Sequence, residues 1–152
     1  MLPIVNTKPD AELIADLDAA EQWAKKEGGD AGRLGIIGFC RGGRTGWIYG
    51  AHSGDLKAGV AFYGPLVDPP SQKSLWPKSA TELAPQMQAP VLGLYGEADQ
   101  GIPLAQVEAM KAALQAAASG PNSRSTPAPR TAFMRITGRA TARRPLMMLG
   151  TA

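Results

Sequence analysis

The sequence is poor in the residues that most often form cross-links or bind metals, with one cysteine and one histidine among 152 residues. A single cysteine excludes a disulfide within the chain and is typical of proteins in a reducing compartment. One cysteine and one histidine together are too few for a structural zinc site. No metal and no other cofactor is therefore expected.

Long apolar runs are also missing. No stretch is long enough to span a bilayer, and the opening residues 1–5 lack the basic start and apolar core of a secretory signal. We therefore expect a cytoplasmic protein without a membrane partner. Hydrophobic residues make up 44% of the chain, which is enough to bury one core.

Acidic residues are absent from the last 32 positions, so charge is distributed unevenly along the chain. Residues 1–120 hold all 13 acidic residues and ten of the 16 basic ones, a net charge of −3, although the whole chain carries +3. The remaining positive charges are six arginines: Arg124, Arg130, Arg135, Arg139, Arg143 and Arg144. Because the basicity belongs to this tail and not to the domain, we infer no nucleic-acid partner.

Apolar strands alternate with helices over the first 118 residues. The predicted strands are 34–37, 58–63 and 91–95, and the predicted helices are 10–26, 43–51 and one that begins at Pro103. Asp10 is the expected N-cap of the first helix. Such alternation predicts a parallel sheet with covered faces. Residues 66–89, rich in proline and serine, are either a substrate-side loop or a solvated connection.

The segment Gly38–Gly43, with the sequence GFCRGG, places Cys40 at a corner between a strand and a helix. We expect Gly38 and Gly42 to let the backbone fold back, which forces Cys40 into a strained conformation with an exposed side chain. This arrangement is that of a nucleophile elbow with sulfur in place of oxygen. The amides and dipole of the following helix would favour the thiolate, and the backbone N–H of Arg41 is the expected oxyanion donor.

Two other interpretations of this segment were weighed. A structural cysteine in a glycine-rich turn is the simpler one. A dinucleotide-binding fingerprint fails on spacing, because Cys40 occupies the place where the second glycine must let the pyrophosphate approach.

A second group of candidate residues follows the third predicted strand, in the turn GEADQGIP at 96–103. Its carboxylates would lie at the carboxyl edge of the sheet, where the elbow also points. Asp99 is the candidate acid of a catalytic triad, which would orient an imidazole and stabilise the imidazolium. Glu97 is the second choice. The alternative is an aspartate that only forms the turn or caps the next helix.

Three segments, GFCRGG at 38–43, Tyr63-Gly64 and GEADQGIP at 96–103, together resemble the dienelactone hydrolase family, also called carboxymethylenebutenolidase. The resemblance covers residues 2–118 and implies a partial α/β-hydrolase fold, a parallel sheet flanked by helices. The change of composition and the loss of any clear period predict an irregular basic tail at 119–152. The resemblance also implies a monomeric enzyme that opens an unsaturated lactone to a dicarboxylic acid without a cofactor. By this resemblance Cys40 is the nucleophile and Asp99 the triad acid.

The candidates for holding an acidic, planar substrate are Arg41, Arg44, Tyr63 and Trp76. Each of them could equally serve packing or solubility. The natural substrate and the oligomeric state stay open at this point.

The chain departs from the family pattern in two ways. The resemblance begins in the middle of the family domain, so early strands are absent, together with a loop that supplies the second oxyanion donor and a glutamate that contacts the resting thiol. The triad histidine should follow Asp99, but no histidine follows His52, which is expected at the end of the elbow helix and is no substitute. Little catalysis is expected as a result.

The tail offers an explanation for the missing histidine. Reading residues 125–142 one base earlier permits a segment containing Pro-His-Gly-Phe-His, which resembles the histidine segment of the family. We therefore hypothesise a one-base slip between about residues 119 and 125. Two alternatives to a hydrolase remain: a non-catalytic binding or regulatory module with a basic tail, and a redox sensor whose Cys40 cycles through sulfenic acid.

Overall fold

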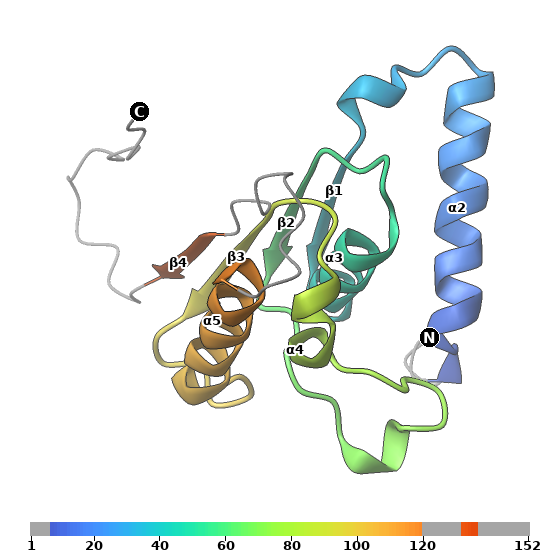
Figure 1. Ribbon diagram of the computed structural model, residues 1–152. Helices are drawn as coiled ribbons and strands as arrows, with labels where there is room; N and C mark the ends of the chain where they lie inside the picture. Colours follow the sequence, from blue (N-terminus) through green and yellow to red (C-terminus); the bar gives the residue numbers. More distant parts are fainter. Residues whose placement is uncertain (1–6, 120–131, 137–152) are drawn as a thin grey trace, which may run out of the picture.

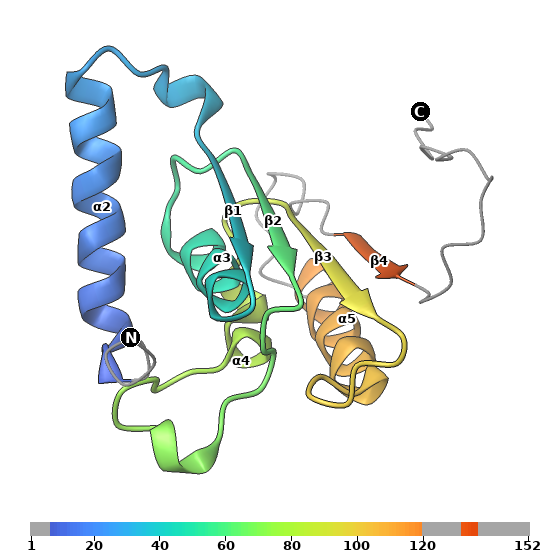
Figure 2. The same cartoon turned by 180° about the vertical axis from the view of Figure 1, so that it is seen from behind.

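The structure is a computed structural model, and it describes residues 7–119 and 132–136. Four parallel strands form one sheet in the order β1-β2-β3-β4 (Figures 1 and 2). Their bounds are Gly35–Phe39 for β1, Ala58–Phe62 for β2, Val91–Gly96 for β3 and Ala132–Ile136 for β4. The predicted parallel sheet is confirmed, and the three predicted strands agree with β1, β2 and β3 to within two residues at either end.

Helices alternate with the strands. The α-helices are α2 (Asp10–Lys26), α3 (Arg41–His52), α4 (Ala80–Leu83) and α5 (Leu104–Ser119), and the short 3₁₀ helices are η1 (Ala31–Arg33), η2 (Pro70–Gln72) and η3 (Ala84–Gln86). Figure 2 shows the sheet in front of α3, α4 and α5, with α2 set to the side of β1. In the described part of the chain these helices cover one face of the sheet. The expectation of covered faces is therefore confirmed for that face only.

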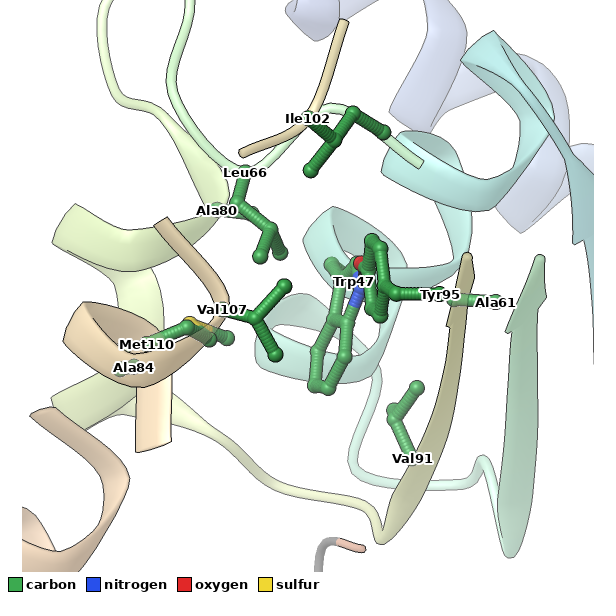
Figure 3. Close-up of a cluster of buried hydrophobic side chains, with 10 residues drawn as sticks. All are labelled: Trp47, Ala61, Leu66, Ala80, Ala84, Val91, Tyr95, Ile102, Val107 and Met110. Atoms are coloured by element: carbon green, nitrogen blue, oxygen red, sulfur yellow. Dashed lines mark hydrogen bonds between the residues drawn. The ribbon is translucent and has the colours of Figure 1, made fainter. Parts of the chain in front are cut away.

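The core lies between this helical layer and the sheet (Figure 3). At its centre Trp47 of α3 is fully buried, and its indole Nε1 donates a hydrogen bond of 2.9 Å to the hydroxyl of Tyr95. That hydroxyl donates in turn to the carbonyl of Gly64 at 3.0 Å. Burial raises the pKa of Tyr95 above its ordinary value, so it keeps its proton as the donor of this chain of bonds.

The strand β4 was not predicted, since it lies inside the segment expected to be irregular. It pairs in parallel with β3, and the ring of Phe133 lies 5.5 Å from the ring of Trp47 and 6.1 Å from that of Tyr95. This partly buried ring packs against the core, a tertiary contact that the sequence, with no clear period here, does not reveal. The proposed slip between residues 119 and 125 and the rest of the tail lie outside the described residues.

Asp10 does not cap α2 as predicted. The residue before the helix is Pro9, which makes no side-chain cap, and Asp10 is the first helical residue. Its carboxylate is buried and binds the guanidinium of Arg44 instead. An acidic residue at a helix start suits either role locally, and here the long-range ion pair determines its position.

Candidate active site

Cys40 lies at the corner between β1 and α3, with φ 54° and ψ −122°. This left-handed φ is unfavourable for a residue with a side chain, and it leaves the thiol exposed, as the sequence predicted. The backbone N–H of Cys40 donates to the carbonyl of Phe62 at 3.0 Å, which ties the corner to the end of β2. The thiol is therefore presented at the carboxyl edge of the sheet.

Close backbone contacts explain why glycines surround the cysteine. A Cβ on Gly38 would lie 2.0 Å from the carbonyl oxygen of Gly42, whereas a Cβ on Gly42 would meet nothing within 4 Å. A Cβ on Gly43 would lie 2.6 Å from the carbonyl oxygen of Phe62, and one on Gly64 would lie 2.4 Å from the backbone nitrogen of Arg44. The elbow thus requires glycine at positions 38, 43 and 64, and the prediction that it also requires glycine at position 42 is wrong, because that position has room for a side chain. The roles of Gly43 and Gly64 were missed, although Gly64 follows the neighbouring strand directly.

The start of α3 supplies amides beside the thiol. The N–H groups of Gly43 and Arg44 donate to the carbonyl of Cys40 at 2.9 and 3.2 Å. Arg41 is the first residue of this helix, so its N–H has no acceptor within the helix. This amide follows Cys40 in the chain, and its role as an oxyanion donor stays a prediction.

The Arg41 side chain lies over an aromatic ring. Its guanidinium carbon is 3.8 Å from the ring centroid of Trp76, and its Nη2 donates to the carbonyl of Lys8 at 3.4 Å. Burial, together with the positive charge of Arg44, lowers the pKa of Arg41 from its usual range. Trp76 is itself 7% exposed and donates from Nε1 to the carbonyl of Lys8 at 3.2 Å. Most of its ring is therefore covered by packing.

Arg44 was predicted to hold substrate, but its surroundings point to a different role. The side chain is 1% exposed, and it donates to both oxygens of Asp10 at 2.7 and 2.9 Å and to Asp68 at 2.6 to 2.9 Å. Burial alone would lower the pKa of Arg44, but these hydrogen bonds outweigh burial and raise it. With both carboxylates buried too, the guanidinium is fully engaged inside the protein.

The loop between β2 and α4 is anchored by the same contacts. Asp68 binds Arg44, Trp76 contacts Arg41, and the carbonyl of Leu75 accepts from the N–H of Asp10 at 3.0 Å. These contacts hold part of residues 66–89 against α2 and the start of α3, while many other residues of the stretch are exposed, so both interpretations of it stay open.

Tyr63 lies where β2 ends, with φ 36° and a side chain that is 45% exposed. Its N–H donates to the carbonyl of Leu94 at 2.8 Å, and its ring centroid is 6.5 Å from that of Phe39. Of the predicted substrate-binding side chains, Tyr63 is the one that is both exposed and next in space to the residue preceding Cys40. Its contact with substrate stays a prediction.

Asp99 lies in the loop after β3, at the same edge of the sheet as Cys40. Its Oδ1 accepts from the N–H groups of Gly101 and Ile102 at 2.8 and 3.2 Å. The carboxylate therefore forms the turn, as the alternative interpretation holds, and its role as a triad acid stays a prediction. Glu97 is exposed in the same loop.

His52 is engaged elsewhere. Its Nε2 lies 3.0 to 3.1 Å from the carboxylate oxygens of Asp18 on α2. It is the last residue of α3, and Cys40 directly precedes the first, so the rise of a helix separates the two by about 18 Å. As the sequence contains no other histidine, no imidazole of this chain reaches the thiol.

No helix in the described part of the chain is long and apolar enough to cross a membrane. Within the same residues no cluster of histidine, cysteine and carboxylate side chains is arranged to hold a metal ion.

Comparison with known proteins gives consistent results. Residues 1–123 match the dienelactone hydrolase family. The "Putative carboxymethylenebutenolidase" of Methylorubrum extorquens is 53% identical over 115 residues, which are 75% of this chain and 39% of that protein. The protein of the same name from Salmonella typhimurium is 51% identical over 114 residues, 75% of this chain and 42% of that protein. The chain thus spans about two fifths of the length of these relatives.

Among solved structures, that of a "Putative Dienelactone Hydrolase" from Klebsiella pneumoniae superposes with a TM-score of 0.70 at 46% sequence identity. The match covers 85% of this chain and 48% of that one. The fold is therefore that of an α/β-hydrolase, as the sequence predicted.

Proposed function

Because the chain belongs to the dienelactone hydrolase family, we propose that it carries the nucleophile part of a hydrolase site for a small-molecule lactone or ester. The observation that carries the proposal is the geometry of Cys40, an exposed thiol in a left-handed conformation at a strand-to-helix corner. The names of the relatives point to butenolide substrates, and Tyr63 and the Arg41 side chain are the groups beside the elbow that would contact one.

In this reaction the Cys40 thiolate attacks the carbonyl carbon of the lactone. The carbonyl oxygen becomes an oxyanion, which the N–H of Arg41 stabilises. Collapse of the tetrahedral intermediate breaks the bond to the ring oxygen, which leaves with a proton taken from water, and a thioester forms on Cys40. Water then hydrolyses the thioester to a carboxylic acid and restores the thiol.

Removing a proton from the thiol and from the attacking water needs a base, and protonating the leaving oxygen needs an acid, but this chain offers no histidine for any of these transfers. Attack by the sulfur of Cys40 can still occur, because cysteine is a strong nucleophile, whereas water must attack the thioester without help. We therefore expect acylation without efficient turnover. Asp99 would have no imidazole to orient, so its substitution should not matter to this chemistry.

The experiment is single-turnover acylation with p-nitrophenyl acetate, followed by mass spectrometry of the intact chain and of peptides. We expect one acetyl group on Cys40, slow deacylation, no adduct in Cys40→Ala and an unchanged rate in Asp99→Asn. An adduct on another residue, or none on Cys40 in the folded chain, would overturn the proposal. A large loss of rate in Asp99→Asn, with an unchanged circular dichroism spectrum, would assign Asp99 a role that does not need histidine.

A second candidate is a non-catalytic binding or regulatory module, which the occupied and distant His52 favours. It requires that the arginine-rich residues 121–152 bind an acidic partner. Affinity for heparin that falls steeply with salt and disappears when these residues are deleted would support it. Salt-independent binding, or binding unchanged by the deletion, would exclude it.

A further inference from the structure

The first turn of α3 is held by contacts from distant segments of the chain. Cys40 directly precedes the helix, and the N–H groups of Gly43 and Arg44 donate to its carbonyl, so the turn has the thiol at one end and Arg44 at the other. Arg41 and Arg44 are three positions apart and lie on one side of the helix. Their guanidinium carbons are 3.8 and 4.9 Å from the ring centroid of the same residue, Trp76.

The ring of Trp76 belongs to the loop between β2 and α4 and is held by the start of α2. It is 7% exposed, and its Nε1 donates to the carbonyl of Lys8 at 3.2 Å. The Nη2 of Arg41 donates to the same carbonyl at 3.4 Å. Figures 1 and 2 show the start of α2 beside this loop, which agrees with the hydrogen bond from the N–H of Asp10 to the carbonyl of Leu75. Arg41 therefore lies on a ring that is itself fixed.

Arg44 fixes the other end of the turn through its ion pairs with Asp10 and Asp68. A guanidinium binds carboxylates in a planar geometry, so its five hydrogen bonds of 2.6 to 2.9 Å restrict this side chain to one position. One positive and two negative charges leave a formal charge of −1, which the nearby guanidinium of Arg41 balances. We refer to the side chains of Asp10, Arg41, Arg44, Asp68 and Trp76 as the elbow clamp.

We propose that the elbow clamp makes Arg41 a positioning residue, whose side chain holds its own backbone N–H at the place where the oxyanion forms beside Cys40. The inference rests on the proposed function, in which this N–H stabilises the oxyanion. A donor must lie about 2.7–3.1 Å from the oxyanion, and loss of one donor slows turnover roughly 10²–10³-fold. The N–H belongs to the first residue of a helix, where helices fray, so anchoring its side chain on Trp76 keeps the amide in place.

Two reactions of the same sulfur separate this role from a general effect on the fold. In acetylation by p-nitrophenyl acetate the sulfur of Cys40 attacks the ester carbonyl, an oxyanion forms, p-nitrophenolate leaves and the thiol proton passes to water. In alkylation by iodoacetamide the sulfur displaces iodide from a saturated carbon, and no oxyanion forms. A change in the amount of thiolate or in its exposure affects both rates and largely cancels from their ratio, whereas a displaced N–H slows acetylation alone.

Both rates are measured on the full chain by mass spectrometry of the Cys40 peptide. Arg41→Met keeps the backbone N–H but loses the guanidinium on Trp76, and we expect the ratio of acetylation to alkylation to fall about tenfold or more. Because p-nitrophenyl acetate is uncharged, lost attraction between Arg41 and the substrate cannot cause this fall. The matched control is Arg33→Met, which removes an exposed guanidinium just before β1, at the end of the strand away from Cys40, and should leave the ratio unchanged.

A double-mutant cycle tests whether Arg41 acts through the ring. Trp76→Leu should lower the ratio by itself, and Arg41→Met should then have no further effect, whereas additive effects would refute the proposal. If circular dichroism shows that Trp76→Leu fails to fold, Arg41→Lys takes its place. An ammonium can lie over the ring, so Arg41→Lys should retain most of the ratio, and a fall as large as that in Arg41→Met would contradict the proposal.

The remaining outcomes distinguish this inference from the proposed function. If Cys40 of the parent is acetylated but the ratio is unchanged in Arg41→Met, or falls equally in Arg33→Met, the inference is overturned and the proposed function stands. An equal loss of both rates in Arg41→Met counts as an unchanged ratio, because it assigns the side chain to the fold of the elbow. If Cys40 of the folded parent is not acetylated, both are overturned.

Discussion

The buried ion cluster of Asp10, Arg44 and Asp68 leads to the prediction with the largest expected effect. Arg44 donates five hydrogen bonds of 2.6 to 2.9 Å to the two carboxylates, and these three residues are 1 to 8% exposed. Arg44→Met keeps most of the side-chain volume but leaves two buried carboxylates without a partner. Removing one member of a buried ion pair costs about 3–5 kcal/mol.

This loss is a large fraction of the roughly 5–15 kcal/mol by which a domain is stable. Urea unfolding followed by tryptophan fluorescence, to which the buried Trp47 and Trp76 both contribute, measures it. With a slope of about 2 kcal/mol per molar urea, the midpoint should fall by about 2 M. Replacing all three residues, as in Asp10→Leu, Arg44→Met and Asp68→Leu together, should recover much of the loss, because no unpaired charge remains buried.

The matched control is Arg33→Met. Arg33 pairs with Asp30 at 2.8 Å, a distance similar to those of Arg44, but the two side chains are 83% and 53% exposed. Such a pair contributes about 0–1 kcal/mol. If Arg44→Met lowers the urea midpoint no more than Arg33→Met does, the buried ion cluster contributes no more to stability than an exposed pair. The expected cost of leaving buried carboxylates unpaired is then refuted.

Three further predictions follow from the site and its surroundings. Gly38→Ala should abolish folding, since its Cβ would lie 2.0 Å from a backbone oxygen, whereas Gly42→Ala, with nothing within 4 Å, should leave the circular dichroism spectrum and the urea midpoint unchanged. Equal effects of the two substitutions would contradict the close contact. The hydrogen bond from Lys73, together with those from the backbone and the hydroxyl of Ser79, lowers the pKa of Glu82 from 4.5 to about 2. Glu82 therefore stabilises the fold above pH 4.5 and loses this effect as the pH falls toward 2. The melting temperature of Glu82→Gln should accordingly lie below that of the parent at pH 7 and converge with it near pH 2, and a constant difference would refute the linkage. Sequencing the coding DNA in all three frames should reveal the Pro-His-Gly-Phe-His segment in a neighbouring frame beyond residue 123, where the family match ends; its absence would make the arginine-rich tail genuine.

Local signals in the sequence were sufficient for most of the fold. The strands could be predicted because short apolar runs are bounded by glycine and proline, and the corner at Cys40 because two glycines bracket it. What could not be predicted depends on residues far apart in the chain. Arg44 binds Asp10 and Asp68, 34 and 24 positions away, so neither its burial nor the true role of Asp10 is visible locally. For β4 the decisive contact is that of Phe133 with Trp47.

The elbow is assembled from contacts within residues 35–64. The thiol can therefore be positioned even where the rest of the catalytic site is missing. The positive φ of Cys40 is held by its hydrogen bond to Phe62, by the approach of Gly38 to Gly42 and by the packing of Gly43 on Gly64. None of these contacts involves Asp99 or a histidine. The rate of Cys40 alkylation, compared with the rate in the urea-unfolded chain, therefore reports whether the elbow has formed, and turnover reports whether the rest of the site is in place. A chain that is alkylated faster than its unfolded form but hydrolyses its thioester slowly would have an intact elbow and lack the groups that complete the site. A chain that is alkylated no faster than its unfolded form would show that the elbow itself depends on parts of a family domain beyond these residues.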